Sequence, residues 1–194
     1  LLQAFCMKNS YSFEPLYEML DLVVVSIASD IVPITGENRI LAYFGLKQLN
    51  SAPRSGLKAI IQIAGIENKE ICIDDIVFKI GPRINAAGRI ETGTSSVELL
   101  IAENEALALD MGDMINDFNN TRRNIDSNIT KEALDMIASD KDQHNRKTTV
   151  LFNPSWHKGV VGIVASRLIE TYYRPTIVLT ESNGLITGSA RSVT

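Results

Sequence analysis

Residues 148–182 decide the fold of this chain, and they read TTVLFNPSWHKGVVGIVASRLIETYYRPTIVLTES. The short runs 148–152 and 176–180 are rich in β-branched and apolar residues, which predicts two strands. Between them a polar turn at 153–158 precedes residues 159–172, whose apolar positions recur at helical spacing. Strand, helix and strand in this order predict a βαβ unit with parallel strands and a right-handed crossover. This part of the chain is therefore expected to be α/β.

The residues after this unit predict a third strand. Asn183-Gly184 is a strong signal for a two-residue hairpin turn, so the chain is expected to return as a strand at Leu185–Ser189. Side chains alternate along a strand, so Ser189 and Arg191 are expected on one face if the strand continues. A hydroxyl and a guanidinium on one face can hold a terminal phosphate. The alternative is a solvent-facing strand end without a ligand.

A buried strand is also predicted near the N-terminus. The run Leu22–Ala28 is apolar on both sides and largely β-branched, which is typical of a parallel sheet. Asp30 follows at its carboxyl end, where ligands bind in open α/β sheets, and its carboxylate suits a hard cation. An Asp here can equally be a helix N-cap, and the residues leave both possibilities open. Helices are predicted at 38–50 and 55–64, with Gly65 placed to end the second.

A long helix is predicted from about residue 103 to residue 139, because apolar residues recur there at helical spacing. Gly112 weakens such a helix by about 1 kcal/mol relative to Ala. A helix of this length extends about 55 Å, more than a compact domain needs, so we expect it to connect two lobes. Before it, Ser95 and Glu98 have the spacing of a capping box, which predicts a helix start near residue 99.

The run Gly81–Arg89, which reads GPRINAAGR, concentrates residue types that can bind phosphate. Its glycines and proline predict a loop. The guanidinium groups of Arg83 and Arg89 suit phosphate oxygens, and Asn85 can serve a phosphate or a turn. The alternative is that both arginines form structural ion pairs with Asp or Glu, and the residues alone do not decide between the two.

Trp156 and His157 lie just before the predicted helix at 159–172, where backbone N–H groups favour anions. The indole of Trp156 can stack on a nucleic-acid base. The alternative for Trp156 is packing against the core, and the alternative for His157 is a hydrogen bond to a backbone carbonyl.

Composition excludes several classes of protein. The 194 residues are 45% hydrophobic and 22% charged, which excludes disorder and collagen-like structure. No apolar run reaches the roughly 18 residues of a membrane span, so a soluble, cytoplasmic protein is expected. The net charge of -4 provides no general basic field, and a polyanion would need a local cluster. The two cysteines and two histidines form no metal-ligand motif, and phosphate-cradling glycine loops are absent.

Three runs together resemble one family. They are residues 26–33 followed by Asn38-Arg39, the run Gly81–Arg89, and residues 156–168 followed by residues 174–175 and 188–192. Their order and spacing are similar to those of the RecJ family of single-strand-specific DNA exonucleases, in the DHH phosphoesterase superfamily. The first residue is not Met and the last follows a strand directly, so the chain is expected to be a piece of a longer protein.

The resemblance implies an α/β enzyme of two lobes. Residues 1–80 would form the C-terminal part of a parallel-sheet DHH lobe, residues 81–145 a signature loop and connecting helix, and residues 146–194 a truncated, nucleic-acid-binding DHH-associated lobe. Such an enzyme hydrolyses phosphodiester bonds from the 5′ end of single-stranded DNA in repair and recombination. Two Mn²⁺ or Mg²⁺ ions serve as its cofactors, and single-stranded DNA threads between the lobes. A monomer without a membrane partner is expected.

The resemblance also assigns residues to this chemistry. Asp30 matches the last metal-binding aspartate of the family. Residues of the signature run match a segment beside the active site and are expected to be catalytic or to contact DNA: Arg83, Asn85 and Arg89. Residues of the second lobe match segments that grip the 5′-terminal phosphate or line the DNA path: Ser189 and Arg191 for the phosphate, Trp156 and His157 for the path.

Two parts of the family pattern are missing from this chain. The resemblance implies that the Asp-x-Asp and Asp-His-His motifs that supply most metal ligands would lie before Leu1, and that the glycine-rich, His-containing motif of the second lobe would lie after Thr194. The chain alone is therefore expected to lack nuclease activity. Two alternatives stay open: a fragment of another DHH phosphoesterase that acts on short oligonucleotides or cyclic dinucleotides, and a non-catalytic nucleic-acid-binding module.

Overall fold

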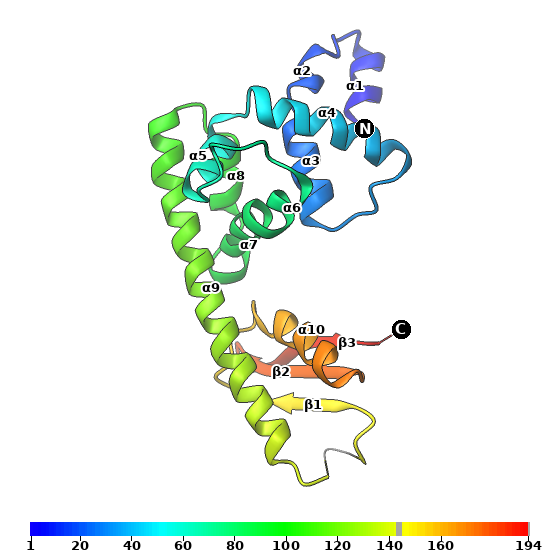
Figure 1. Cartoon of the computed structure of the whole chain (residues 1–194), viewed down its shortest axis with the longest axis vertical. Coiled ribbons are helices and arrows are strands. Elements are labelled where there is room, and N and C mark those ends of the chain that lie inside the picture. The colour runs from blue at the N-terminus through cyan, green and yellow to red at the C-terminus, as the bar shows by residue number, and fades with distance from the viewer. Residues whose placement is uncertain (143–144, 194) are drawn as a thin grey trace. The chain divides into compact units, whose positions relative to one another are not determined.

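The computed structural model describes residues 1–142 and 145–193, and the chain divides into two compact units, Leu1–Phe118 and Asn119–Thr194. The first unit is helical (Figure 1). Its elements before the long helix are α1 (Leu2–Asn9), α2 (Glu14–Tyr17), α3 (Leu20–Ser29), α4 (Gly36–Ser51), α5 (Ser55–Ile63), α6 (Ile73–Asp75), the π-helical turn η1 (Ile76–Ile80), α7 (Gly81–Ile90) and α8 (Thr94–Leu100). Helix α9 (Glu105–Ser139) begins in the first unit and ends in the second.

The second unit contains the predicted βαβ arrangement and hairpin. Its elements after α9 are β1 (Thr149–Phe152), α10 (Val161–Tyr172), β2 (Thr176–Ser182) and β3 (Leu185–Arg191). Strand β1 pairs in parallel with β2, and β2 pairs with β3 antiparallel. Ser182 pairs with Leu185 across a two-residue turn in which Asn183 and Gly184 have φ values of 54° and 73°. The sequence-based prediction is confirmed, because both turn residues adopt the positive φ that this hairpin requires.

One face of this sheet carries the core of the second unit. Along β1 the side chains alternate between buried and exposed, as expected of a strand with a helix layer on one side. Helix α10 buries Val161, Val164, Ala165 and Leu168, which lie on one helical face. They pack in one cluster with Leu151 and Val178 of the strands and with Ile129, Ala133 and Ile137 of α9. At about 1.5–3 kcal/mol for each fully buried large aliphatic side chain, this cluster is what holds the unit together.

The strand predicted at 22–28 is wrong, because these residues form helix α3. The buried side chains of α3 include Asp21, Val24, Val25 and Ala28, which recur at helical spacing. A run that is apolar on all sides has no period that separates a strand from a buried helix, so packing decides. Helix α4 lies so close that a Cβ on Gly45 would be 2.4 Å from the carbonyl oxygen of Leu20.

The loop predicted at 81–89 is also wrong, because these residues form helix α7 after the π-helical turn η1. Pro82 lies in the first helical turn, where its missing N–H and fixed φ favour a helix start rather than a break. Ala86 and Ala87 are fully buried and anchor the helix in the core. Glycine and proline therefore mark the beginning of this helix, not a loop.

The capping box predicted at Ser95 and Glu98 is not formed either. Helix α8 begins earlier, after Gly93, and ends where the helix was expected to start. Ser96 is buried within α8, and its hydroxyl donates to the carbonyl of Ile84 at 2.6 Å, which ties α8 to α7.

The other predicted helices are confirmed as α4, α5 and α9. Gly65 ends α5 with φ 66°, and the N–H groups of Gly65 and Ile66 bond to Gln62 and Ile61, as in a Schellman motif. In α9, Gly112 permits close packing, since a Cβ there would be 2.6 Å from Ile63 Cδ1. Within the described residues, none of the helices, α9 included, combines the length and apolar character needed to cross a membrane.

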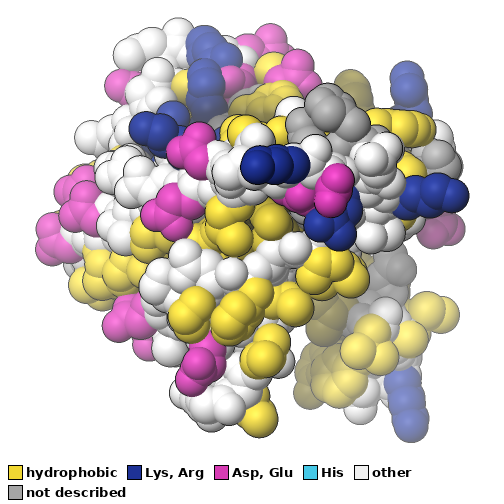
Figure 2. Space-filling model, turned by 90° about the horizontal axis from the view of Figure 1, so that it is seen from below, with side chains coloured by type: hydrophobic (Ala, Val, Ile, Leu, Met, Phe, Trp, Pro, Cys, Tyr) yellow, Lys and Arg dark blue, Asp and Glu magenta, His cyan; other side chains and the backbone are white. Residues whose placement is uncertain are grey.

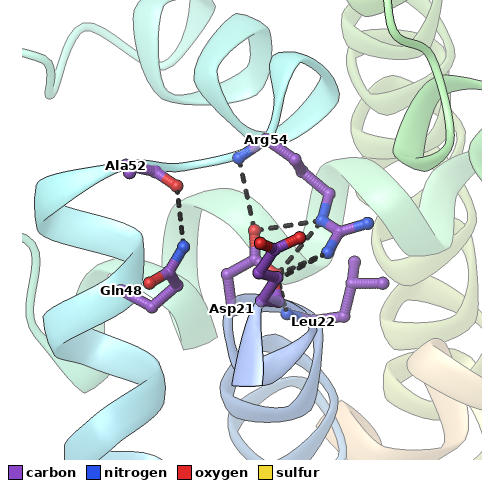
Figure 3. A network of polar contacts seen from close by, with 6 residues as sticks. Asp21, Leu22, Gln48, Ala52 and Arg54 are labelled. Carbon is purple, nitrogen blue, oxygen red and sulfur yellow. Dashed lines mark hydrogen bonds and ion pairs between the residues drawn. The ribbon is translucent and has the colours of Figure 1, made fainter. Parts of the chain in front are cut away.

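A buried ion pair connects α3 to the start of α5 (Figure 3). The Asp21 side chain is 1% exposed, and its carboxylate accepts hydrogen bonds from Arg54 Nη2 at 2.8 Å and Arg54 Nε at 3.0 Å. The backbone N–H groups of Leu22 and Arg54 also donate to this carboxylate. A buried carboxylate needs such partners, so this network holds the N-terminal end of α3 in place. Asp30 follows the other end of the helix.

Candidate nucleic-acid interface

Two of the three runs meet inside the first unit. Gly81 lies against the end of α3, where a Cβ would be 2.5 Å from Ser29 Oγ. Asp30 is the C-cap residue of α3 and is exposed, with Ile31 following at φ 54°. Its expected place at the end of a strand is wrong, and it does not cap a helix N-terminus. The contact between Ser29 and Gly81 nevertheless brings the Asp30 segment to the start of the arginine-bearing helix α7.

Helix α7 divides its polar side chains between two directions. Arg83 is partly buried and donates from Nε to Asn116 Oδ1 of α9 at 3.1 Å and from Nη1 to the Lys79 carbonyl at 2.8 Å. Asn85 and Arg89 are exposed and lie one turn apart, so they share a face of the helix. The guanidinium of Arg83 is thus oriented by α9 and η1, while Asn85 and Arg89 are accessible to a ligand.

The residues that the structure describes do not form a complete metal site. Among residues 1–142 and 145–193, no group of three or more His, Cys, Asp or Glu side chains is arranged to hold an ion. Magnesium and similar hard cations need several oxygen ligands, and Asp30 offers only one carboxylate.

Polar side chains of β3 and α10 gather in the second unit. Arg191 Nη1 donates to Ser189 Oγ at 3.0 Å, which confirms that the two side chains share a face. Arg191 Nε donates to Ser166 Oγ of α10 at 3.2 Å. Gly162, one turn before Ser166, faces the same two β3 residues. We call these four residues, Gly162, Ser166, Ser189 and Arg191, the α10–β3 cluster.

Trp156 and His157 organise the turn that leads into α10. The Trp156 side chain is 4% exposed, packs in the core and donates from Nε1 to Glu132 Oε2 at 2.8 Å. Thr180 Oγ1 donates to the Trp156 carbonyl at 2.6 Å. His157 Nδ1 accepts a hydrogen bond from the backbone N–H of Gly159 at 3.2 Å, and this bond orients the imidazole ring against the turn. This burial favours the core-packing interpretation of Trp156.

A second buried carboxylate lies beside the site of the first unit. Asp75 accepts hydrogen bonds from Lys69 Nζ at 2.6 Å and from the N–H of Cys72 at 3.3 Å, and it forms an ion pair with Lys79 Nζ at 3.1 Å. The hydrogen bond from Lys69 is the main reason why the pKa of Asp75 lies well below its ordinary value. This cluster anchors η1, whose Lys79 carbonyl in turn holds Arg83.

The distribution of basic side chains on the surface is consistent with anion binding at small clusters. On the face shown in Figure 2, Lys and Arg side chains lie in small separate groups among acidic and apolar ones. With a net charge of -4, attraction of a polyanion depends on placed clusters rather than on a broad basic field.

Sequence reasoning missed three residues of these sites: Asn116, Gly162 and Ser166. Gly162 and Ser166 are four residues apart, which places both on one face of the predicted helix. That this face meets Ser189 and Arg191 follows from how α10 packs on β3, which no local pattern in the sequence encodes. Asn116 lies on the long helix without a distinctive neighbourhood.

Comparisons with known proteins agree with the resemblance. No protein-family model matches the chain. The chain is 38% identical over 178 residues to the single-stranded-DNA-specific exonuclease RecJ of Bacillus subtilis, covering 91% of this chain and 22% of the relative. It is 35% identical over 184 residues to the same protein of Escherichia coli, covering 92% of this chain and 32% of the relative.

Solved structures show the same likeness. The structure matches RecJ from Thermus thermophilus in complex with Mg²⁺ with a TM-score of 0.83 at 27% identity, covering 98% of this chain and 29% of that one. A RecJ structure from the same organism in complex with Mn²⁺ matches with the same TM-score. The predicted α/β class is confirmed by these matches.

The chain is therefore homologous to one segment of a single-stranded-DNA-specific exonuclease. In each of these relatives that exonuclease is RecJ, which confirms the resemblance of the three sequence runs. The chain spans between about a fifth and a third of the length of these curated relatives, which fits the expectation of a piece of a longer protein. The two matched RecJ structures from Thermus thermophilus are complexes with Mg²⁺ and with Mn²⁺.

Proposed function

We propose that this chain is part of a RecJ-type exonuclease that removes nucleotides from the 5′ end of single-stranded DNA, in DNA repair and recombination. The relatives are named as exonucleases specific for single-stranded DNA. In this proposal the complete enzyme is metal-dependent, works with two Mn²⁺ or Mg²⁺ ions, and acts as a monomer in the cytoplasm. The role of the present chain is to hold the DNA end and part of the active-site surroundings.

The α10–β3 cluster carries the proposal. Two of the three guanidinium nitrogens of Arg191 are occupied, Nε by Ser166 and Nη1 by Ser189 and the Ala190 carbonyl. Among the described residues, Arg191 Nη2 has no hydrogen-bond partner, and Ser189 Oγ donates to none. A terminal phosphate offers oxygen acceptors to both donors, and hydrogen bonds from a guanidinium to phosphate are among the stronger ones in proteins.

The first unit supplies the proposed surroundings of the reacting phosphodiester. Arg89 and Asn85 are exposed on α7 and are proposed to contact the DNA backbone, while Arg83 is proposed to act from its fixed position against α9. Asp30 is proposed as one metal ligand. Among the described residues no further ligands are grouped to hold an ion, so the chain by itself is proposed to be without nuclease activity.

The proposed DNA path includes the turn before α10. Because the Trp156 side chain is 4% exposed, its contribution is to shape this turn from the core. His157 is only partly buried, and the nitrogen opposite to Nδ1 is left for a ligand such as a phosphate oxygen. Contact with DNA at this turn is therefore proposed for His157.

An end-preference titration tests the proposal. Fluorescence anisotropy at low salt compares one labelled single strand with a 5′-phosphate, a 5′-hydroxyl or a 3′-phosphate, and the corresponding duplex. The proposal predicts tightest binding to the 5′-phosphorylated single strand. Equal affinity for both phosphorylated ends would contradict 5′-end recognition, and tighter binding of the duplex would contradict single-strand specificity.

The candidate of a different DHH phosphoesterase is tested by competition. A dinucleotide or a cyclic dinucleotide is titrated against the bound labelled strand. Displacement at a competitor concentration equal to that of the strand would favour that alternative, whereas a need for a large excess would favour the longer single strand as ligand.

A further inference from the structure

Ser166 is oriented by the backbone of its own helix. Its hydroxyl donates to the carbonyl of Gly162 at 3.2 Å, one turn earlier in α10. Because the hydroxyl hydrogen is used there, the oxygen lone pairs are left to accept the N–H of Arg191 Nε, at 3.2 Å. Ser166 thus fixes one edge of the Arg191 guanidinium.

Gly162 lets α10 lie close to β3 beside the unoccupied edge of the same guanidinium. A Cβ at Gly162 would lie 3.5 Å from Arg191 Nη2, in van der Waals contact, and 3.2 Å from Ser189 Oγ, which is tighter than an ordinary contact. These are the two donors that have no acceptor among the described residues. A side chain at this position would therefore lie against both donors.

We propose that Ser166 and Gly162 complete the site for a terminal phosphate, Ser166 as a positioning residue for Arg191 and Gly162 as a residue that determines specificity because it places no side chain against the two donors. This inference rests on the proposed function, since the ligand is the 5′-phosphate of a single strand. A phosphomonoester carries more charge and more acceptor oxygens than a 5′-hydroxyl, so the site distinguishes the two ends.

Substitution of Ser166 tests the positioning role. For each variant, Kd is measured for the 5′-phosphate strand and for the 5′-hydroxyl strand, and their ratio gives the phosphate preference. Ser166→Ala should reduce this preference by about three- to tenfold with little effect on the hydroxyl strand, as expected for loss of one hydrogen bond that orients a charged donor. Ser166→Thr retains the hydroxyl and should keep the preference.

Thr171 provides the matched control. It lies on the same helix, and its hydroxyl makes the same kind of bond to the carbonyl four residues earlier, Arg167, at 3.1 Å. Thr171→Ala should leave the phosphate preference unchanged. An unchanged preference in Ser166→Ala, or an equal loss in Thr171→Ala, would overturn the assignment of Ser166.

Substitution of Gly162 tests the need for a glycine. Ala favours a helix more than Gly does, and the tight contact of the added methyl group is with the side-chain atom Ser189 Oγ, so α10 should remain folded in Gly162→Ala. The methyl group would lie against Ser189 Oγ and Arg191 Nη2 and should lower the phosphate preference by about tenfold or more, the size expected for a displaced charge-assisted hydrogen bond. A variant that keeps both the fold and the phosphate preference would refute the role of Gly162.

A measurement without DNA distinguishes failure of the proposed function from failure of the role assigned to Ser166. The Nε–H signal of Arg191 in ¹H–¹⁵N NMR, identified by its loss in Arg191→Lys, should shift on titration with inorganic phosphate and should broaden in Ser166→Ala. If the wild-type chain responds to neither phosphate nor a phosphorylated end, both the proposed function and this inference fail. If the wild type prefers the phosphorylated end and Ser166→Ala is unchanged in both assays, only the present inference fails.

Discussion

Arg191 Nη1 donates a hydrogen bond to Ser189 Oγ at 3.0 Å, between two residues of β3 separated by a single position. The Asn183-Gly184 hairpin sets the register that places Ser189 opposite Val178 and Arg191 opposite Thr176. Helix α10 then closes the cluster through Ser166. A short polar pattern near the end of the chain thereby becomes a hydrogen-bonded arrangement of donors.

Salt dependence of DNA binding should be modest and should depend on Arg191. Each phosphate neutralised by a bound cation contributes a slope of about -0.7 to log K against log salt concentration for single strands. Arg191→Ala should therefore reduce the slope by about 0.7. Anisotropy titrations over a series of salt concentrations give this slope, with Arg123→Ala, which removes an exposed arginine from the same unit, as control. Equal slopes for wild type and Arg191→Ala would argue against a phosphate contact.

The chain alone should not degrade DNA. With only Asp30 as a proposed ligand, bound Mn²⁺ or Mg²⁺ would lack most of its coordination. Incubation of a 5′-labelled single strand with the chain and either metal should leave the strand intact on a denaturing gel. Degradation that requires Mn²⁺ and that Asp30→Ala abolishes would show that this expectation is wrong.

Loss of Asp21 should destabilise the first unit. The Asp21–Arg54 pair is nearly enclosed on the Asp21 side, and removal of one partner leaves Arg54 partly buried without its counter-charge. Asp21→Ala should lower the free energy of unfolding by about 3 kcal/mol. Urea denaturation followed by circular dichroism measures this change.

The exposed pair of Lys58 and Glu105 is the control for that experiment, with side chains 55% and 66% exposed. Glu105→Ala should change the free energy of unfolding by less than about 1 kcal/mol. Similar losses in both variants would mean that burial of the Asp21 pair has no special importance.

Because of Asp75, the free energy of unfolding should depend on pH in the acidic range. Its hydrogen bond from Lys69 and its ion pair with Lys79 lower the folded-state pKa below the ordinary value of 3.8. A carboxyl with a depressed folded pKa contributes stability above its unfolded pKa, and this contribution is lost as the pH falls through the folded pKa. The difference in unfolding free energy between wild type and Asp75→Asn should thus be largest near neutral pH and shrink toward about pH 3. Urea unfolding at several pH values tests this, and a constant difference would contradict it.

The second unit was predictable from its sequence because each of its elements carries a local signal. The β-branched runs, the Asn183-Gly184 turn and the apolar spacing of residues 159–172 agree with the observed fold. The first unit was less predictable. Leu22–Ala28 has the composition of a strand, and only its packing against α4 shows that it is a helix. Pro82 favours a break when only its neighbours in the sequence are considered, although it begins α7.

In the candidate sites, likewise, relationships within one element were predictable and contacts between different elements were not. The shared face of Ser189 and Arg191 was predicted because it depends only on the alternation of a strand. The contacts of Arg83 with Asn116 and of Arg191 with Ser166 join different elements and could not be predicted from local pattern. Burial of Trp156 likewise depends on Glu132 of α9, which is distant in the sequence.

Recognition of a 5′-terminal phosphate by Arg191 is best tested with a cycle that combines one substitution and one change of ligand. Kd is measured for wild type and Arg191→Ala against the same single strand with a 5′-phosphate and with a 5′-hydroxyl. Wild type should prefer the phosphorylated strand by about tenfold or more, and the preference should disappear in Arg191→Ala while binding of the hydroxyl strand changes little. A phosphate preference that survives the loss of Arg191, or a wild type that binds both strands equally, would contradict it.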